Sequence, residues 1–355
     1  MPVFQQGELL DFTRRIFEKS GCPSSEARRV AQSLVEANLS GHDSHGVIRV
    51  VQYVKAIETG VMKPGQELKI IQEKPSLICA DGGWNLGQVQ AHRLLELLIP
   101  KASQTGVAAG TLFQCGHIGR LGEYAEAAGL HGMALLATVN NHGFGRAVAP
   151  PGGKAGRIAT NPICLSAPTE QDPVVLDIGT SVCAEGKVRV SYNKKAKAPD
   201  GWLLDSEGKP TNDPGVLYHE PKGTIQPLGG AQSYKGFGLG LLLDMLVGGL
   251  SGGPCSNPAV EPRSANAVLF VLFCPAQFAG MEHFLNETTG LSRSVRDCPK
   301  AEGFTGPIVL PGDLERHERA KRSVEGINLD DGTWGQIQEL ATRKGVDFPT
   351  KASPK

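Results

Sequence analysis

The stretch Val107–Arg120, VAAGTLFQCGHIGR, carries the strongest signal in this chain of 355 residues. Its first part, Val107–Leu112, consists of small and branched residues, which is typical of a buried strand. The strand runs into Gln-Cys-Gly-His, where His117 stands between glycines that remove side chains around it. Polar side chains at a strand end are common places for ligand chemistry. The stretch therefore predicts an α/β protein with a candidate functional histidine at the end of a strand.

The surrounding patterns extend this α/β prediction along the chain. A second buried strand, Ala134–Val139, ends in the polar run Asn140-Asn141-His142. Further strands are expected over Leu68–Ile71, Leu77–Ala80, Ile163–Ala167, Val174–Asp177 and Ala267–Phe273. Helical spacing of apolar residues predicts two helices in the first 40 residues, then helices over Val47–Ile57, Val89–Leu98, Glu123–Leu130 and Lys235–Leu250, and two more after Pro311. Between about 140 and 230, dense Gly, Pro and Asn predict a sheet with irregular connections.

Composition narrows the classes of function. The chain has 36 Lys+Arg and 36 Asp+Glu, so its net charge is zero and it has no basic block for nucleic acid. It has no uncharged apolar segment of 18 residues, so we expect no membrane span, and no secretory signal is visible. The eight cysteines are dispersed without a zinc spacing, which indicates reduced core thiols in a cytoplasmic protein.

The densest polar cluster is His42-Asp43-Ser44-His45-Gly46, followed by Arg49. A guanidinium beside a titratable imidazole suits a carboxylate substrate that must also exchange a proton. Two readings from other classes compete. His42 and His45, three positions apart, could hold a metal with His117, and Ser44 beside His45 could be an activated hydroxyl of a hydrolase.

Other candidate groups lie after the remaining strands. Asp177, at a strand end, could orient a histidine, while Thr160-Asn161-Pro162 offers small polar groups or simply a turn. No G-x-G-x-x-G motif follows a strand. The most similar run of glycines, Gly236–Gly240, is weak evidence for dinucleotide binding. It is equally well explained by a helix packed closely against a neighbouring element.

Taken in order, these segments resemble one family. They are Asp43-Ser44-His45-Gly46-Val47 with Arg49 and Tyr53, Gly116–Arg120, Thr160-Asn161-Pro162, Asp177 with Thr180-Ser181, Gly186-Lys187-Val188, Gly201-Trp202, Pro210-Thr211, Tyr234–Leu239, Leu250-Ser251-Gly252 and Pro311-Gly312-Asp313. This order and spacing are similar to the type-2 malate/L-lactate dehydrogenase family, which includes ureidoglycolate and sulfolactate dehydrogenases and piperideine-carboxylate reductase. The resemblance runs from about residue 7 to 350.

The resemblance implies a fold and a division into domains. It implies an α/β protein whose NAD(P)-binding domain is not a Rossmann fold and has a largely antiparallel sheet. Residues 119–299 would form that domain. Residues 1–118 and 300–355 would form a helical and mixed domain for substrate binding and dimerisation. It also implies a homodimer or a larger homo-oligomer.

The resemblance also assigns roles to residues. His117 matches the proton acceptor of the hydroxyacid branch, and Ser44, His45 and Asp177 match the relay of the imine-reducing branch, so both histidines stay candidates. Arg49 would bind the substrate carboxylate. The residues expected to line the cofactor are Asn141, Thr160, Asn161, Pro162, Lys235, Pro311, Gly312 and Asp313, the last standing where the family usually has Glu.

The implied activity is hydride transfer between a nicotinamide cofactor and a small 2-hydroxy or 2-oxo carboxylate, with no metal. NAD is preferred, with NADP as the alternative. The rival within the class is a reductase of cyclic 2-imino acids. The rival from another class is a metal-dependent hydrolase built on His42, His45 and His117, and a third reading is an inactive member that acts by binding.

Overall fold

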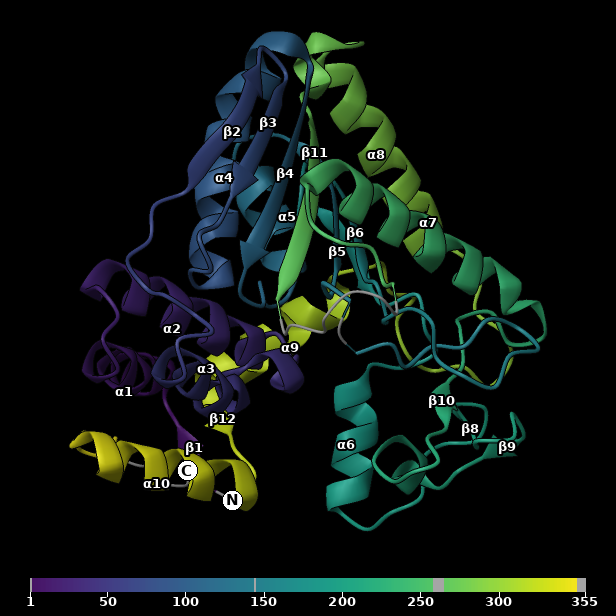
Figure 1. Ribbon diagram of the computed structural model, residues 1–355. Helices are drawn as coiled ribbons and strands as arrows, with labels where there is room; N and C mark the ends of the chain where they lie inside the picture. Colours follow the sequence, from purple (N-terminus) through teal and green to yellow (C-terminus); the bar gives the residue numbers. More distant parts are fainter. Residues whose placement is uncertain (1, 144, 258–264, 350–355) are drawn as a thin grey trace.

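The computed structural model describes residues 2–143, 145–257 and 265–349. A seven-stranded sheet stands at the centre (Figure 1) in the order β2-β3-β4-β11-β5-β6-β7. Its strands are β2 Lys69–Lys74, β3 Leu77–Asp81, β4 Val107–Cys115, β5 Ala134–Asn140, β6 Ile163–Ala167, β7 Val174–Ile178 and β11 Asn266–Phe273. Only the β3–β4 pair is parallel, so the sheet is largely antiparallel, as expected.

Strand β11 lies at the middle of the sheet, between β4 and β5. Its residues alternate in environment with the two-residue period of a strand. Val268, Phe270 and Leu272 belong to the large core on one face. Ala267 and Leu269 belong to a smaller core on the other face. Because both faces are covered, the strand is apolar throughout, which is why it was recognisable from the sequence.

Helices form a layer on each face of this sheet (Figure 1). Helices α4, Gly87–Thr105, and α5, Gly122–Gly129, pack on the face of the large core. Helix α7, Tyr234–Ser251, packs on the opposite face. None of the helices in the described ranges is both long and apolar enough to cross a bilayer.

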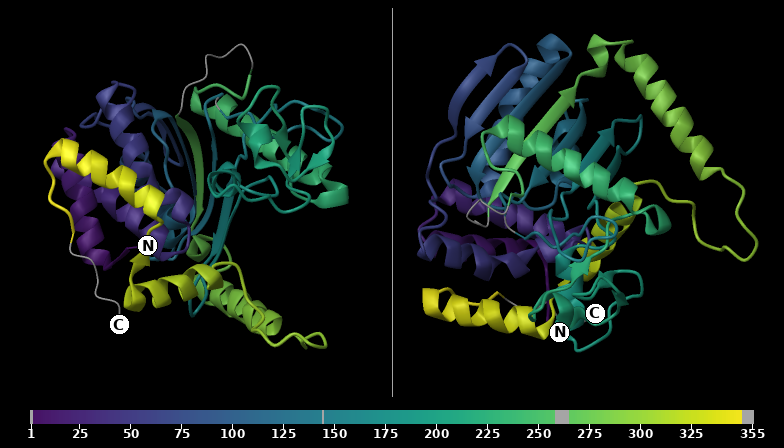
Figure 2. Two further views of the ribbon diagram at one scale, coloured as in Figure 1. Left: turned by 90° about the horizontal axis from the view of Figure 1, so that it is seen from below. Right: turned by 45° about the vertical axis from the view of Figure 1, so that its right-hand side comes forward.

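The two ends of the chain share one helical core below the sheet (Figures 1 and 2). Its elements are β1 Val3–Phe4, α1 Gln6–Lys19, α2 Ser24–Leu39, α3 Val50–Glu58, β12 Ile327–Asn328 and α10 Asp331–Lys344. Strands β1 and β12 pair antiparallel. The ring of Trp334 of α10 packs in a tilted arrangement against Phe4, at 4.5 Å between centroids, and against Phe12, at 5.7 Å. The two ends of the chain therefore fold together.

A separate lobe is built from the irregular middle of the chain (Figure 1, teal). It contains α6 Glu185–Asn193 and a three-stranded sheet of β8 Leu203–Leu204, β9 Pro210–Thr211 and β10 Thr224–Ile225.

The remaining helices are α8 Met281–Arg296, α9 Asp313–Glu325 and short 3-10 turns at Asp43–His45, Val47–Arg49, Pro214–Leu217, Gly230–Gln232 and Pro275–Gln277. Figure 2 shows α8 along the outer side of the molecule, with the segment after it extending outward.

Two sequence-based expectations need qualification. The expected domain boundary between residues 118 and 119 falls within a single sheet, because β2–β4 pair into the same sheet as β11 and β5–β7. The eight cysteines are all free thiols, as expected, but they are not all core residues: Cys298 is exposed and Cys79 and Cys255 are half-buried.

Candidate active site

Several of the expected site residues lie at the ends of the central strands, next to the helical core of the chain ends. Asn266, at the start of β11, joins two of these strand ends. Its amide nitrogen donates to the carbonyl of Asn140 at 3.0 Å, and its amide oxygen accepts from the backbone N–H of Ile118 at 2.9 Å. The loop that carries His117 is thereby anchored to the end of β5.

Strained backbone is concentrated around the strand termini of the sheet. Of the five described non-glycine residues with positive φ, four adjoin sheet strands: Trp84 (+62°), Gln114 (+51°), His142 (+49°) and Asn161 (+23°). Such conformations are uncommon for residues with side chains and cluster at functional sites. Their distribution supports the placement of the site at these strand ends.

His45 and His117 come together face to face. Their rings are stacked with centroids 5.5 Å apart and an interplanar angle of 24°. His45 comes from the 3-10 turn after α2, and His117 from the end of β4. The Nδ1 atom of His45 lies 3.0 Å from the Ser44 hydroxyl. Three of the four residues expected to take part in proton transfer, Ser44, His45 and His117, are therefore neighbours.

The turn that carries His45 is shaped by Asn38 of α2. The Asn38 amide oxygen accepts from the backbone N–H of Val47 at 2.8 Å, and its nitrogen donates to Asp43 at 2.7 Å. A Cβ atom at Gly46 would lie 2.2 Å from the Asn38 side chain, so only glycine fits there. Asn38 and Gly46 thus fix the path of the chain between α2 and the site.

Both imidazoles are held neutral. Burial, followed by the charges of Arg49 and His42, lowers the pKa of His45 to about 3. Burial, followed by the charge of Arg49, also holds the pKa of His117 well below its ordinary value. Nδ1 of His117 lies 2.7 Å from the hydroxyl of Tyr53, which is fully buried in α3. Two uncharged imidazoles beside one guanidinium form a cationic site that can accept and donate a proton.

Arg49 is oriented by the backbone of the same turn. Its Nε donates to the carbonyl of Ser44 at 2.7 Å, and Nη1 donates to the Gln52 side chain at 2.8 Å. These bonds leave hydrogens at the end of the guanidinium for a further acceptor. A carboxylate is the acceptor that an arginine fork fits best.

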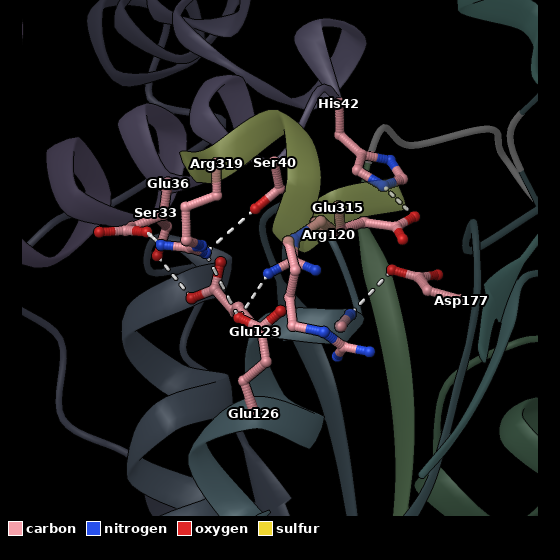
Figure 3. A network of polar contacts seen from close by, with 12 residues as sticks. Ser33, Glu36, Ser40, His42, Arg120, Glu123, Glu126, Asp177, Glu315 and Arg319 are labelled. Atoms are coloured by element: carbon pink, nitrogen blue, oxygen red, sulfur yellow. Dashed lines mark hydrogen bonds and ion pairs between the residues drawn. The ribbon is translucent and has the colours of Figure 1, made fainter. Parts of the chain in front are cut away.

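Asp177 and His42 form their hydrogen bonds with groups other than His45 and His117, as Figure 3 shows for the His42–Glu315 pair and for Asp177. Asp177 accepts a hydrogen bond of 2.8 Å from the backbone N–H of Gly122, and His42 lies 3.1 Å from Glu315 of α9. Burial, only partly offset by that N–H and by His42 and Arg120, raises the pKa of Asp177. The expected relay from Asp177 to His45 is not formed, because the end of β7 faces α5 and α9 instead.

The same geometry argues against the metal-dependent hydrolase. His42 pairs with Glu315 and does not join His45 and His117. Among the residues that the structure describes, no group of three His, Cys, Asp or Glu side chains could hold a metal ion.

Two of the residues expected to line the cofactor, Thr160 and Asn161, are bonded to the turn after β7, and a third, Pro162, is bonded to β5. Thr180 donates from its N–H to the carbonyl of Thr160 at 2.9 Å and from its hydroxyl to the carbonyl of Asn161 at 3.1 Å. The Asn161 amide donates to the carbonyl of Gly240 at 2.9 Å, while its buried amide oxygen has no hydrogen-bond partner. The Pro162 carbonyl accepts from Thr138 at 2.8 Å. Asn141 follows β5 and is half-buried.

Lys235 lies in the first turn of α7. It is exposed and forms no ion pair within the described parts of the chain. The preceding loop contains Gly229 and Gly230, both with positive φ, and Ser233 does not cap the helix with its side chain. A Cβ atom at Gly236 would lie 2.3 Å from the carbonyl oxygen of Leu228. Close packing, one of the two interpretations of this glycine series, is thus found at Gly236. The uncapped helix end with its lysine suits a phosphate.

Pro311, Gly312 and Asp313 precede and begin α9. The Pro311 carbonyl accepts from the N–H of Val175 at 3.1 Å, which holds this turn against β7. Asp313 is engaged with protein groups, because Arg296 and Arg316 both donate to its carboxylate. Partial burial opposes ionisation, but these bonds and the Leu310 N–H lower its pKa to about 2. Its carboxylate is thus occupied in holding the turn.

Sequence reasoning gave no role to Tyr53, Gln88, Asn38 or Asn266. Tyr53 stood within a quoted motif, and its position four residues after Arg49 on an expected helix could have flagged it. Asn266 and Gln88 gave no signal, because their partners lie far away in the chain.

The comparisons with known proteins show the family of the chain. The malate/L-lactate dehydrogenase family matches residues 4–338. Hydroxycarboxylate dehydrogenase B of Escherichia coli K12 is 34% identical over 352 residues, which cover 98% of this chain and 96% of that protein. The solved sulfolactate dehydrogenase of Methanocaldococcus jannaschii has a TM-score of 0.86 at 32% identity and covers 98% of each chain. A Δ1-piperideine-2-carboxylate reductase from Pseudomonas syringae has a TM-score of 0.83 at 26% identity, covering 96% of this chain and all of that one.

Proposed function

The chain belongs to the malate/L-lactate dehydrogenase family, and on that premise we propose that it moves a hydride between a small 2-hydroxy or 2-oxo carboxylate and a nicotinamide cofactor. The observation that carries the proposal is the stacked pair of neutral histidines, 5.5 Å apart, beside the guanidinium of Arg49. A 2-hydroxy acid needs both features, a cation for its carboxylate and an imidazole for its hydroxyl proton.

Arg49 binds the carboxylate through the free end of its guanidinium. The bound carboxylate offsets the charge of Arg49, which in the free protein depresses the pKa of both histidines. Substrate binding therefore raises the pKa of both imidazoles, so that one of them can accept the proton that the hydroxyl must lose. Proton transfer of this kind contributes on the order of 10²- to 10⁴-fold to the rate.

The cofactor that we propose is NAD, with NADP as the alternative, bound without a Rossmann motif. It supplies or accepts the hydride at its nicotinamide ring. The exposed Lys235 and the uncapped N-terminus of α7 are suited to its phosphates, and the unpartnered amide oxygen of Asn161 can accept a hydrogen bond from a bound group. We assign Asn141, Thr160 and Pro162 to the same cradle.

Pro311, Gly312 and Asp313 complete the proposed cradle, with the turn rather than the engaged Asp313 carboxylate making the contact. In domain terms, residues 119–299 carry most of the cofactor site. The domain formed by the two chain ends carries His45 and Arg49 for the substrate, both from its N-terminal part.

We also propose that the chain forms a homodimer or a larger homo-oligomer through α7. The outward face of this helix is unusually apolar for a surface. Its exposed residues are Tyr234, Leu239, Leu242, Met245, Leu246 and Leu250. A contiguous apolar face of this kind on a monomer marks an interaction site.

A cyclic 2-imino acid is the second candidate substrate. It is favoured by the similarity to the piperideine-carboxylate reductase, and it needs the same carboxylate grip and proton supply. We place it second, because the more similar relatives named above act on hydroxy acids.

The test is a substrate screen followed by two histidine variants. We expect NADH or NADPH oxidation with one or more small 2-oxo acids, followed by absorbance. In His45→Ala and His117→Ala, kcat should fall by at least about 100-fold while cofactor affinity is retained. Full activity in both variants on an established substrate would rule out the mechanism, and activity on cyclic imines alone would select the second candidate.

A further inference from the structure

The hydroxyl of Tyr53 is the nearest polar partner of His117 that the structure gives, at 2.7 Å from Nδ1. Tyr53 belongs to α3 and has no exposed surface. We propose that Tyr53 is a positioning residue that holds His117 as the tautomer protonated on Nε2. The catalytic meaning of this inference rests on the proposed function, whereas the tautomer itself can be measured without any turnover.

The direction of the hydrogen bond follows from a second donor. The backbone N–H of Gly119 points at the same Nδ1 atom at 3.3 Å. A backbone N–H can only donate, so Nδ1 must be the unprotonated nitrogen of the ring. Tyr53 therefore donates to it as well. Any proton on the neutral imidazole is left to Nε2.

A hydrogen bond from Gln88 of α4 to Tyr53 agrees with Tyr53 donating to His117. The Gln88 amide nitrogen donates to the hydroxyl oxygen of Tyr53 at 3.2 Å. The tyrosine hydroxyl thus accepts one hydrogen bond and donates another, which orders the chain Gln88, Tyr53, His117. Burial raises the pKa of Tyr53 to about 12, so its hydroxyl keeps its proton across the physiological range.

The tautomer of His45 is not fixed in this way. Its Nδ1 partner, the Ser44 hydroxyl at 3.0 Å, can turn to donate or to accept, so either tautomer of His45 is satisfied. We therefore assign different roles to the two histidines. His117 donates a hydrogen bond from Nε2 to the substrate oxygen on C2, and His45 exchanges the proton.

The bonds balance in this assignment. In the oxidation direction the O–H bond breaks and its proton passes to an unprotonated nitrogen of His45. The C2–H bond breaks as a hydride, whose electron pair reduces the nicotinamide, and the C2–O bond becomes a carbonyl. His117 keeps its proton throughout and stabilises the charge on oxygen, as a neutral hydrogen-bond donor does in a buried site.

The tautomer is tested first on the wild-type protein by long-range proton–nitrogen NMR of protein labelled with ¹⁵N-histidine. His117→Gln identifies the signal of His117 by its loss. We expect the pattern of an imidazole protonated on Nε2. A proton on Nδ1 overturns the proposal, and this result does not depend on whether any substrate is turned over.

The role of Tyr53 is tested in Tyr53→Phe, which keeps the packed ring. We expect loss of the single tautomer of His117 and a fall in kcat of about 10- to 100-fold, the usual effect of removing a partner that orients a histidine. KM for the carboxylate should change little, since Arg49 is untouched. An unchanged tautomer together with unchanged kcat would overturn the proposal.

Tyr124→Phe is the matched control. Tyr124 is also fully buried, and its hydroxyl donates to the carbonyl of Ile118 at 2.6 Å rather than to a histidine. It should leave the tautomer of His117 unchanged. If Tyr124→Phe disturbs the tautomer as much as Tyr53→Phe does, the effect is one of packing and the assignment fails. If no carboxylate or imine is a substrate, the proposed function fails while the NMR result still decides the tautomer.

Discussion

At the scale of single residues, Arg49 links substrate binding to the charge of the site. It is the charged residue whose field lowers the pKa of both His45 and His117. It is also the residue best placed to meet a carboxylate, since Ser44 and Gln52 orient it from one side. One guanidinium can therefore both anchor a substrate and add to the effect of burial, which is the main cause of the lowered pKa of both imidazoles.

Replacing Arg49 by Gln should separate these two effects. We expect a loss of about 1.5–3 kcal/mol in binding of the carboxylate, hence about a 10- to 150-fold lower kcat/KM. In the free protein the pKa values of His45 and His117 should both rise, because the cation that disfavours their protonation is gone. Steady-state kinetics and histidine NMR titration measure the two effects. If kcat/KM is lost without any rise in pKa, the electrostatic coupling is wrong.

At the scale of elements, helix α7 is matched to the loop that it packs against. Gly236 stands against the backbone of Leu228, where a Cβ atom would lie 2.3 Å from a carbonyl oxygen. Backbone cannot move aside as a flexible side chain can. The helix therefore needs glycine at this position in spite of the cost of glycine in a helix.

Gly236→Ala should destabilise the protein by about 1–3 kcal/mol, the usual cost of overpacking. It should also weaken cofactor binding, because the loop that precedes α7 must shift. Gly238→Ala, two residues further along, is the control: no atom lies within 4 Å of its added Cβ, and it should stabilise by up to about 1 kcal/mol. Urea unfolding with and without NAD measures both. Equal stability of the two variants would contradict the close approach.

The elements themselves were largely predictable, with informative exceptions. Strand β4 runs to Cys115 rather than Leu112, because its last residues pair with the start of β11. Helix α4 continues to Thr105 through Pro100, although proline normally ends a helix. Its buried face packs on the sheet, and this tertiary contact outweighs the local signal. Helices α6 and α8 were missed. Helix α6 buries only Val188 and has a weak apolar stripe, whereas the helical spacing of Phe284, Leu291 and Val295 in α8 could have predicted that helix.

At the scale of the whole molecule, the two neutral histidines make the fold sensitive to acid. Their folded pKa values lie below the unfolded value near 6.5, so the unfolded chain binds more protons below that pH. Stability is therefore complete above about pH 6.5 and is lost as pH falls towards 3, by about 1.4 kcal/mol per pH unit for each histidine. Asp177, whose pKa is raised, opposes this trend at the acid end.

His45→Gln should reduce the pH dependence of the free energy of unfolding, because the variant lacks one of the two groups that take up a proton on unfolding. Urea midpoints measured between pH 7 and pH 4.5 give the slope, which should be steeper in the wild type than in the variant. His131→Gln is the control, because that residue belongs to the turn before β5, away from the site. A wild-type slope no steeper than that of His45→Gln would show that His45 is not held neutral in the folded state.

The assembly state is the second prediction at this scale. Leu242→Lys places a charge in the middle of the apolar face of α7 and should shift a dimer or larger oligomer toward monomer. Leu130→Lys is the matched control, since Leu130 is 88% exposed on an isolated turn, and it should leave the assembly unchanged. Sedimentation velocity measures both. A wild-type protein that is monomeric at every concentration would refute the proposed interface.

The local pattern of residues was enough to identify the candidate groups and most of the elements that carry them. Buried strands, helical stripes and the motifs around His45, Arg49 and His117 are encoded in neighbouring positions, where periodicity and turn chemistry act. The family resemblance could also be recognised from the sequence, because the motifs that carry it are short segments of neighbouring residues.

Which candidate groups meet was decided by packing between distant segments. The pairing of β4 with β11 and the seating of α3 against the loop after β4 bring Tyr53, His45 and His117 together. The same packing directs Asp177 to Gly122 and His42 to Glu315, so the expected relay and the metal site are not formed. Periodicity along the chain carries no information about such contacts, because they depend on how whole layers fit against one another.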